Sequence, residues 1–190
     1  NLNENQKEAT LHIDGPLLIV AGAGSGKTKV LTSRIAHIIK QHKAFPNQIL
    51  AVTFTNKAAK EMQIRVSKLL RKEATGLPWL GTFHSISAKL LRKHANAVGL
   101  KSNFSIIDQD DQVRLIKNIC KAENVDIKKI SPKYILAVID KWKNKGFYPQ
   151  DVILKKKDPL EKNFLSIYKI YQQKLIDLNS SDFSDLILHI

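Results

Sequence analysis

Residues 21–28 decide the fold, and they read Ala-Gly-Ala-Gly-Ser-Gly-Lys-Thr between an apolar run and a helix-like segment. Glycines let successive backbone N–H groups turn inward around an anion, because a residue without a Cβ permits both the conformation and the close approach. A helix that begins at the loop directs the positive end of its dipole at the same anion. The stretch therefore predicts a phosphate-binding loop for a nucleoside triphosphate.

The loop departs from the usual pattern G-x-x-x-x-G-K-[ST] at Ala21, where the pattern has glycine. Lys27 offers a point charge to the β and γ phosphates, and the hydroxyl of Thr28 is placed to bind the accompanying Mg²⁺. We expect Lys27 and Thr28 to be the catalytic residues of the loop and Thr28 to be the metal ligand. The expected nucleotide-binding residues of the loop are Ala21, Gly22, Ala23, Gly24, Ser25, Gly26, Lys27 and Thr28.

Composition and charge narrow the class of protein. The chain has 190 residues, of which 43% are hydrophobic, enough for the core of one or two small domains. Its single cysteine, Cys120, falls in a helical apolar pattern, so we expect it to be buried in a protein of the reducing cytoplasm. No apolar run is long enough to span a membrane. The net charge of +14 is shared by both halves of the chain, which favours a nucleic-acid partner over a charged tail.

Strands are predicted to alternate with helices in the first half of the chain, which indicates a parallel sheet with crossover helices. The second half shows a helical pattern with no further strand, with helices beginning after Asp108, Ser131 and Asp158. We therefore expect an α/β domain over 1–85 and a mainly helical domain over 86–190. The expected strands are 17–21, 49–54 and 79–83, the first of them buried on both faces, and the expected helices between them are 4–12, 28–41, 56–70 and 84–94.

Further segments carry a resemblance to a known family. Residues 2–9 (Leu-Asn-Glu-Asn-Gln-Lys-Glu-Ala), 52–62 (Val-Thr-Phe-Thr-Asn-Lys-Ala-Ala-Lys-Glu-Met) and 81–85 (Gly-Thr-Phe-His-Ser) stand around the loop in the order and spacing of the Q motif, motif Ia and motif Ib. Residues 182–186 (Asp-Phe-Ser-Asp-Leu) are similar to the stretch that precedes the DExx box. The chain thus resembles the superfamily 1 DNA helicases of the UvrD/Rep/PcrA type.

The resemblance implies a RecA-like P-loop core with an incomplete parallel sheet and a helical insertion subdomain. It implies ATP and Mg²⁺ as cofactors, and 3′-to-5′ translocation on single-stranded DNA in cytoplasmic repair or replication restart. Duplex junctions and repair proteins are the expected further partners. The DExx box and the second RecA-like lobe are expected outside this chain, so we expect the 190 residues alone to bind ATP weakly and to hydrolyse it poorly.

The resemblance also assigns residues outside the loop. Gln6 is expected to read the adenine edge, and Lys29 stands where relatives usually carry an arginine whose flat guanidinium could contact the base or sugar. Stacking of Phe54 on a base competes with packing of its ring in the core, and His84 could equally cap a helix. The expected DNA-binding residues are Thr53, Phe54, Thr55, Asn56, Lys57, Thr82, Phe83 and His84.

Several alternatives stay open at this point. Asp108 follows an apolar stretch and could be mistaken for the magnesium-binding acid, but the next residue is Gln109 where a hydrolytic ATPase needs a second acid, so we expect Asp108 to begin a helix. A helicase-nuclease of the RecB/AddA kind would share these motifs. A nucleoside or shikimate-type kinase would need an acceptor pocket and a lid, for which 86–190 gives no sign. A DNA-binding module that retains the loop without catalysis is also compatible with the sequence.

Overall fold

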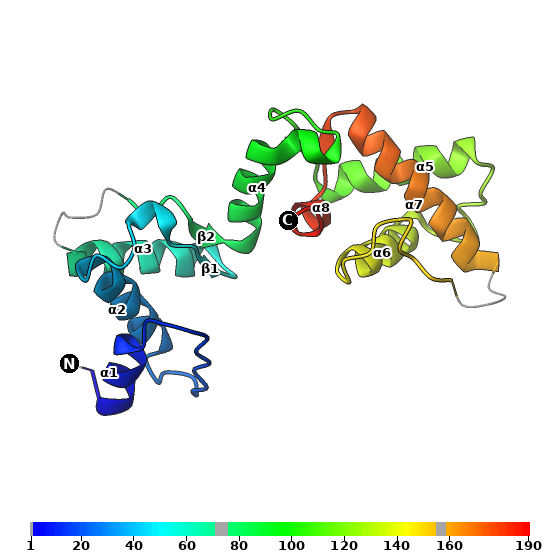
Figure 1. Ribbon diagram of the computed structural model, residues 1–190. Helices are drawn as coiled ribbons and strands as arrows, with labels where there is room; N and C mark the ends of the chain where they lie inside the picture. The colour runs from blue at the N-terminus through cyan, green and yellow to red at the C-terminus, as the bar shows by residue number, and fades with distance from the viewer. Residues whose placement is uncertain (1, 71–75, 155–158) are drawn as a thin grey trace. The chain divides into compact units, whose positions relative to one another are not determined.

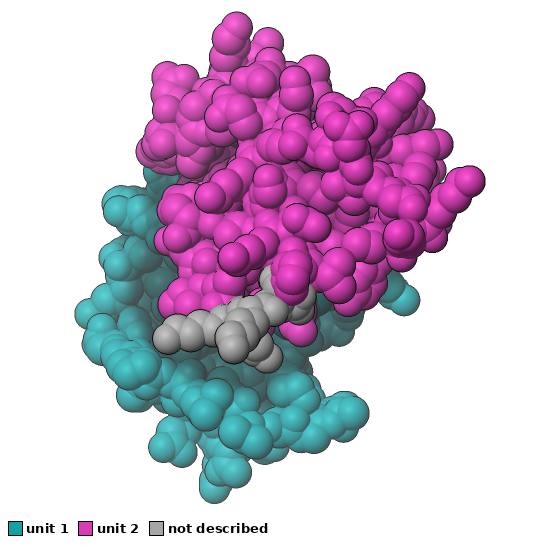
Figure 2. All heavy atoms as spheres, turned by 90° about the vertical axis from the view of Figure 1, so that its right-hand side faces the viewer, with its two compact units in different colours: residues 1–86 teal, residues 87–190 magenta. Residues whose placement is uncertain are grey.

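The computed structural model describes residues 2–70, 76–154 and 159–190, drawn in colour in Figure 1. The chain divides into two compact units, residues 1–86 and 87–190, which Figure 2 distinguishes by colour. Each unit has an apolar core of its own. Among the residues that the structure describes, no helix combines the length and the apolar composition that crossing a bilayer would require.

The first unit is built from helices that begin at recognisable caps. Asn3 and Gln6 form a reciprocal capping box at the start of α1, because each side chain accepts the other residue's backbone N–H. Thr55 caps α3, since its hydroxyl accepts the N–H of Ala58 at 3.1 Å. Both predicted caps are confirmed. The elements are α1 (Glu4–Leu11), α2 (Lys27–Lys40), a 3₁₀ turn (Pro46–Gln48), β1 (Ala51–Thr53), α3 (Asn56–Leu70), β2 (Leu80–Thr82) and α4 (Phe83–His94), the last of which continues into the second unit.

Strands β1 and β2 form a parallel pair with Ala51 opposite Leu80 and Thr53 opposite Thr82. The α3 helix connects them and buries one face on the pair, as expected of a crossover helix. The predicted parallel pairing is confirmed, although each strand is shorter than its apolar pattern suggested. The core around the pair is formed by Ile35, Ala36, Ile39, Ala51, Ala59, Met62, Val66, Leu70, Leu77 and Leu80.

The prediction of a buried strand at 17–21 is wrong for this chain. The segment has no regular secondary structure, and Leu18 and Val20 are 86% and 88% exposed. A strand needs a neighbouring backbone to accept and donate its hydrogen bonds, and within the described residues β1 pairs with β2 alone. The apolar pattern predicted burial, but no strand of the described part of the chain pairs with this segment.

The second unit is mainly helical and contains one short parallel pair, between residues 105–106 and 180–181, that the sequence pattern did not predict. Ile107 donates its backbone N–H to the carbonyl oxygen of Ser181, which extends that pair by one bond. Asp108 caps α5 by accepting the N–H of Asp111 at 2.8 Å, so its expected role in beginning a helix is confirmed. The predicted cap Asp158 lies outside the described residues. The elements are a 3₁₀ turn (Ala95–Val98), β3 (Ser105–Ile106), α5 (Gln109–Ala122), α6 (Pro132–Lys143), α7 (Pro159–Asp177), β4 (Ser180–Ser181) and α8 (Phe183–Leu188).

Helices α5, α6 and α7 enclose the core of the second unit. Cys120 is completely buried in it, as predicted, and burial raises the pKa of its thiol. A thiol with a raised pKa is a poor nucleophile, so Cys120 serves as a small apolar residue. The core residues are Ile116, Ile119, Cys120, Ile135, Leu136, Ile139, Phe164, Ile167, Tyr168, Tyr171 and Leu175.

A buried ionic cluster joins the end of the chain to this core. Nζ of Lys143 lies 2.7 Å from Oδ2 of Asp182 and 2.7 Å from Oδ1 of Asp185, and all three side chains are almost wholly inaccessible. The Tyr171 hydroxyl donates to Asp182 at 2.8 Å, and the Gln172 amide donates to both oxygens of Asp185 at 3.1 Å. Proximity to these carboxylates adds to burial in raising the pKa of Tyr171. The cluster therefore fixes α8 to α6 and α7.

His189 borders the same cluster. Its Nδ1 lies 3.0 Å from the hydroxyl of Tyr148, and its Nε2 lies 3.7 Å from Oδ1 of Asp185. Burial lowers the pKa of His189, and Lys143 lowers it further, while Asp185 and Asp182 oppose the shift. The folded unit therefore holds a neutral imidazole at a pH where the unfolded chain already binds the proton.

We expect this histidine to make the second unit less stable as the pH falls. A pKa lowered by folding means that protons bind first to the unfolded chain, so stability is lost below the ordinary histidine pKa of about 6.5 at up to about 1.4 kcal/mol per pH unit. Urea unfolding followed by Trp142 fluorescence in a Trp79→Phe background reports on this unit. The slope of the unfolding free energy against pH should shrink in His189→Gln. It should persist in the control His94→Gln, because the side chain of His94 is exposed.

Asp140 lies near the same cluster and also titrates. The effect of His189 must therefore be measured as a difference between variants. Burial, followed by the charges of Asp182 and Asp185, raises its pKa, against an opposing hydrogen bond from Ser184 and the charge of Lys143. The contribution of Asp140 to the pH dependence of stability has the opposite sign and lies at lower pH. It is common to both variants, so it cancels when they are compared. Equal slopes in His189→Gln and in the parent chain would show that His189 does not cause the effect.

Candidate functional site

The loop before α2 turns through two left-handed glycines. Gly24 (φ 74°) and Gly26 (φ 85°) are left-handed, and Gly26 is the N-cap of α2. A Cβ added at Gly26 would lie 3.0 Å from Nε2 of Gln6, so a side chain there would strain the backbone and crowd α1. Ser25 closes the turn, because its hydroxyl donates to the carbonyl oxygen of Gly22 at 2.7 Å. The two glycines and the Ser25 hydrogen bond thus hold the loop in a turn at the start of α2.

Lys27 lies in the first turn of α2 and folds back over the loop. Its Nζ donates to the carbonyl oxygens of Ala21 at 2.5 Å and of Gly22 at 2.6 Å. The residue is exposed, so a phosphate could replace these carbonyls without disturbing a core. Thr28 follows it on the same turn and is exposed as well. The structure therefore brings together the two residues that the sequence assigned to phosphate and to magnesium.

Gln6 on α1 completes this site and is already engaged. Its Nε2 donates to the carbonyl oxygen of Ser25 at 3.0 Å, while its Oε1 accepts the N–H of Asn3 at 3.1 Å. The amide therefore joins α1 to the phosphate loop. A side-chain amide has two N–H donors and two oxygen lone pairs, so these two bonds do not use up the hydrogen-bonding capacity of Gln6.

A pocket of about 230 Å³ lies between α1, the segment before the loop and the first turns of α2. Asn5 and Ala9, one helical turn apart on α1, line it, and the sequence analysis missed both. Their spacing on the face that carries Gln6 was the available signal. The predicted Lys29 is exposed in the first turn of α2 and is not one of the lining residues, which are Asn3, Asn5, Gln6, Ala9, Ile19, Val20, Ala21, Ser25, Lys27 and Val30.

The metal prediction rests on a single hydroxyl. Within the described ranges, no three or more His, Cys, Asp or Glu side chains gather as they would to hold a metal ion. Thr28 is suited to contribute one oxygen ligand to a Mg²⁺ that is otherwise held by phosphates and water, the usual environment of this ion.

The carboxyl ends of β1 and β2 lie at one edge, and each is followed by an aromatic residue. Because Thr53 lies opposite Thr82, Phe54 and Phe83 come next on neighbouring strands. Their ring centroids are 5.2 Å apart with an interplanar angle of 42°. Phe54 is 88% exposed and Phe83 is 40% exposed. The structure thus decides against core packing of Phe54 in this chain.

Two predicted DNA-binding hydroxyls are occupied by helix caps. Thr55 caps α3, and Thr82 is buried and accepts the N–H of Ser85 at 3.1 Å at the beginning of α4. Gly81 makes this approach possible, because a Cβ there would lie 2.6 Å from the Ser85 hydroxyl. These caps hold the two strand ends in place and leave the aromatic rings as the groups presented to solvent.

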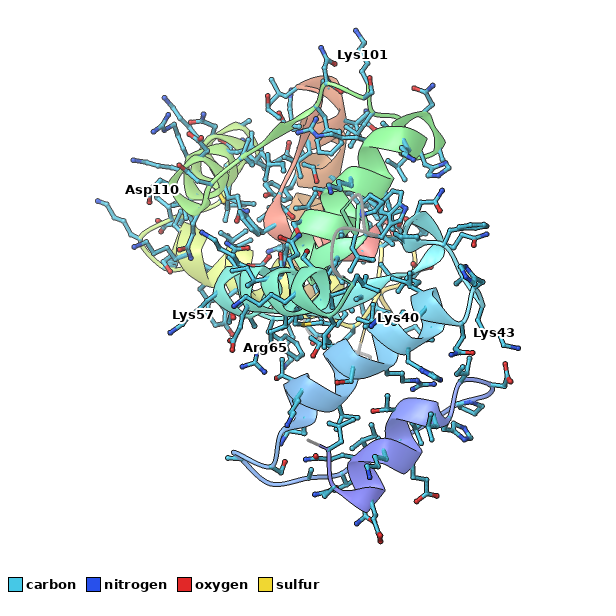
Figure 3. The ribbon with its side chains drawn as sticks, turned by 90° about the vertical axis from the view of Figure 1, so that its left-hand side faces the viewer. Lys40, Lys43, Lys57, Arg65, Lys101 and Asp110 are labelled. Carbon is cyan, nitrogen blue, oxygen red and sulfur yellow. The ribbon has the colours of Figure 1, made fainter. Side chains whose placement is uncertain are left out.

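Polar and positive side chains follow the two aromatic residues in the chain. Asn56 and Lys57 begin α3, and both are exposed. Lys57 and Arg65 project outward from this helix in Figure 3. His84 is exposed in the first turn of α4. The edge therefore combines exposed rings with nearby positive charge, the combination that single-stranded nucleic acid favours.

The chain matches known proteins over its whole length. The family model described as the UvrD/REP helicase N-terminal domain matches residues 2–190. A probable DNA helicase II homolog of Rickettsia conorii is 49% identical over 192 residues, which cover 99% of this chain and 29% of that protein. The ATP-dependent DNA helicase PcrA of Staphylococcus epidermidis is 44% identical over 188 residues, which cover 99% of this chain and 26% of that protein.

A probable DNA helicase II homolog of Mycoplasma capricolum is 46% identical over 193 residues, which cover all of this chain and 27% of that protein. The chain therefore spans less than a third of the length of the curated relatives that it matches.

Proposed function

Because this chain belongs to the UvrD/REP helicase family, we propose that it is the ATP-binding part of an ATP-dependent DNA helicase. The observation that carries the proposal is the left-handed glycine loop at the N-terminus of α2 with Lys27 folded over it. Backbone N–H groups and the helix dipole bind the phosphates, and Lys27 moves from the loop carbonyls to the β and γ phosphates.

The remaining parts of the nucleotide would be held by α1 and by a metal ion. A pocket of about 230 Å³ is smaller than the pockets of about 300–1,000 Å³ that enclose a small ligand, so it would cover only part of the nucleotide. Gln6 and Asn5 supply amide groups that match a purine edge. Mg²⁺ bound to the phosphates would neutralise their charge, with Thr28 as its protein ligand.

We place single-stranded DNA along the strand ends of the first unit. The exposed pair Phe54 and Phe83 offers surfaces on which bases stack, and Lys57 supplies charge for a phosphate. The net charge of +14 supports a polyanionic partner. The capped ends of α3 and α4 keep the two rings a fixed distance apart, which suits a track that contacts successive bases.

The family suggests a role for this arrangement in the whole protein. The parallel pair β1 and β2 with its crossover helix supports a RecA-like core for the first unit. In such a core ATP and DNA bind near the same sheet edge, so closure around the nucleotide can move the DNA contacts. We propose 3′-to-5′ translocation in DNA repair or replication restart as the activity that this coupling serves.

Phe54→Ala should weaken single-stranded DNA binding without unfolding the chain. Loss of one base stack costs about 1–3 kcal/mol, or about 5- to 150-fold in affinity. Because the ring is 88% exposed, the melting temperature should stay within about 1 °C, in line with the small effects of surface substitutions. Fluorescence anisotropy with a labelled oligonucleotide and thermal melting should be measured on the same variant.

Ile64→Ala is the matched control, because Ile64 is an exposed apolar residue of the same unit and lies on α3 away from the strand ends. Its DNA affinity should equal that of the parent chain. The affinity of the parent should also fall with salt at a slope near −0.7 per phosphate contacted. Unchanged affinity in Phe54→Ala would exclude the ring from the track.

A further inference from the structure

A groove of about 400 Å³ crosses the surface of the second unit and shares no residue with the nucleotide pocket or the strand ends. Helix α6, the segment that follows it and the first turn of α7 form its walls. Four large apolar side chains along it are exposed to unusual degrees: Ile153 at 93%, Tyr134 at 59%, Leu160 at 49% and Phe147 at 38%. Apolar side chains gathered in this way mark a binding surface more often than scattered ones do.

The charged residues of the groove are mostly basic. Lys141 and Lys145 stand four residues apart at the end of α6 and line the groove beside Trp142. Both lysines are exposed. An occupant that places apolar side chains in the groove would therefore bring its flanking residues beside two ammonium groups.

Ring contacts hold aromatic side chains that line the groove. Trp142 stacks on Tyr168 with ring centroids 5.9 Å apart, and Tyr134 meets Phe164 edge to face at 5.9 Å. Aliphatic side chains form much of the lining, among them Val138, Val152, Ile153 and Leu160. Glu161 also lines the groove and would repel any anionic group beside it, so the carboxylates of an occupant belong beside the two lysines. The groove therefore favours an occupant with aliphatic anchors.

We propose that this groove docks an acidic amphipathic helix of a partner protein. Apolar residues three or four apart on that helix seat against Ile153, Phe147 and Trp142, and carboxylates beside them pair with Lys141 and Lys145. A basic helix with the same apolar face would meet two like charges in the groove. The two lysines therefore select for an acidic helix.

The test uses the 190-residue chain with Trp79→Phe, so that Trp142 is its only tryptophan. The probe is a synthetic amphipathic helix with leucines on one face and glutamates beside them. Saturable binding should change the Trp142 emission, and Lys141→Glu with Lys145→Glu should weaken it about tenfold or more, since two attractive contacts become repulsive. Ile153→Ser should weaken it as well, and Lys117→Glu on α5, an exposed site outside the groove, should not.

Two further probes complete the experiment. A peptide with lysines in place of the glutamates should bind at least about tenfold more weakly, and equal binding would overturn the charge argument. A single-stranded oligonucleotide should leave Trp142 unchanged, and a DNA response that the groove variants abolish, with none to the acidic peptide, would overturn the proposal in favour of nucleic acid. Absence of any saturable response to the acidic peptide would overturn it too. The groove and control substitutions are all made at exposed residues, so circular dichroism should report the same fold as in the Trp79→Phe parent.

Discussion

Lys27→Ala should reduce the affinity for Mg-ATP by about 100-fold or more while the chain stays folded. Each hydrogen bond from a charged group to a phosphate is worth about 1.5–3 kcal/mol, and the ammonium group is expected to make two of them. The fold should not suffer, because Lys27 is exposed and its present partners are carbonyl oxygens of the loop itself. Equilibrium binding of a fluorescent ATP analogue measures the loss, and thermal melting measures the stability.

Lys40→Ala is the control for this experiment. Lys40 ends the same helix, is exposed and lies a helix length from the loop. Lys40→Ala removes the same charge from the chain as Lys27→Ala does. Any general effect of net charge on the binding of a polyanionic nucleotide should therefore be equal in the two variants. Similar affinities for Lys27→Ala and Lys40→Ala would mean that the loop does not bind phosphate through Lys27.

Lys143→Met should destabilise the second unit by about 3–5 kcal/mol, the cost of leaving buried carboxylates without their counter-ion. Asp182 and Asp185 both lie 2.7 Å from the ammonium group, and both are almost inaccessible to water. Methionine keeps most of the side-chain volume, so the loss reports charge and hydrogen bonding more than packing. Urea unfolding followed by Trp142 fluorescence, again with Trp79→Phe, measures it.

The matched control is Lys133→Met, which makes the same substitution at an exposed position of α6. It should change the stability by less than about 0.5 kcal/mol. Adding Asp182→Asn and Asp185→Asn to Lys143→Met should recover part of the loss, since the buried charge is then removed with its partner. A loss below about 1 kcal/mol in Lys143→Met would show that the carboxylates are neutral or hydrated in the folded chain.

The sequence determined the local features of this protein. The glycine pattern predicted the loop, because left-handed φ values such as those of Gly24 and Gly26 are a property of single residues. The caps at Asn3, Thr55 and Asp108 could be found in the same way, since each cap bonds a backbone N–H only three residues away. Helical periodicity gave the faces of the long helices, and the motifs gave the family.

Contacts between distant residues were decided only by the tertiary structure. Exposure of Leu18 and Val20 depends on whether another strand lies against them, which no local pattern records. The sequence left open whether Phe54 packs in the core, and the tertiary structure leaves its ring exposed. Lys143 and Asp182 are far apart in the chain, so nothing short of the folded unit could show that they form a buried ion pair. Caps and loop conformations depend on residues close together in the sequence and can be predicted from it. Burial depends on which distant segments come into contact when the chain folds.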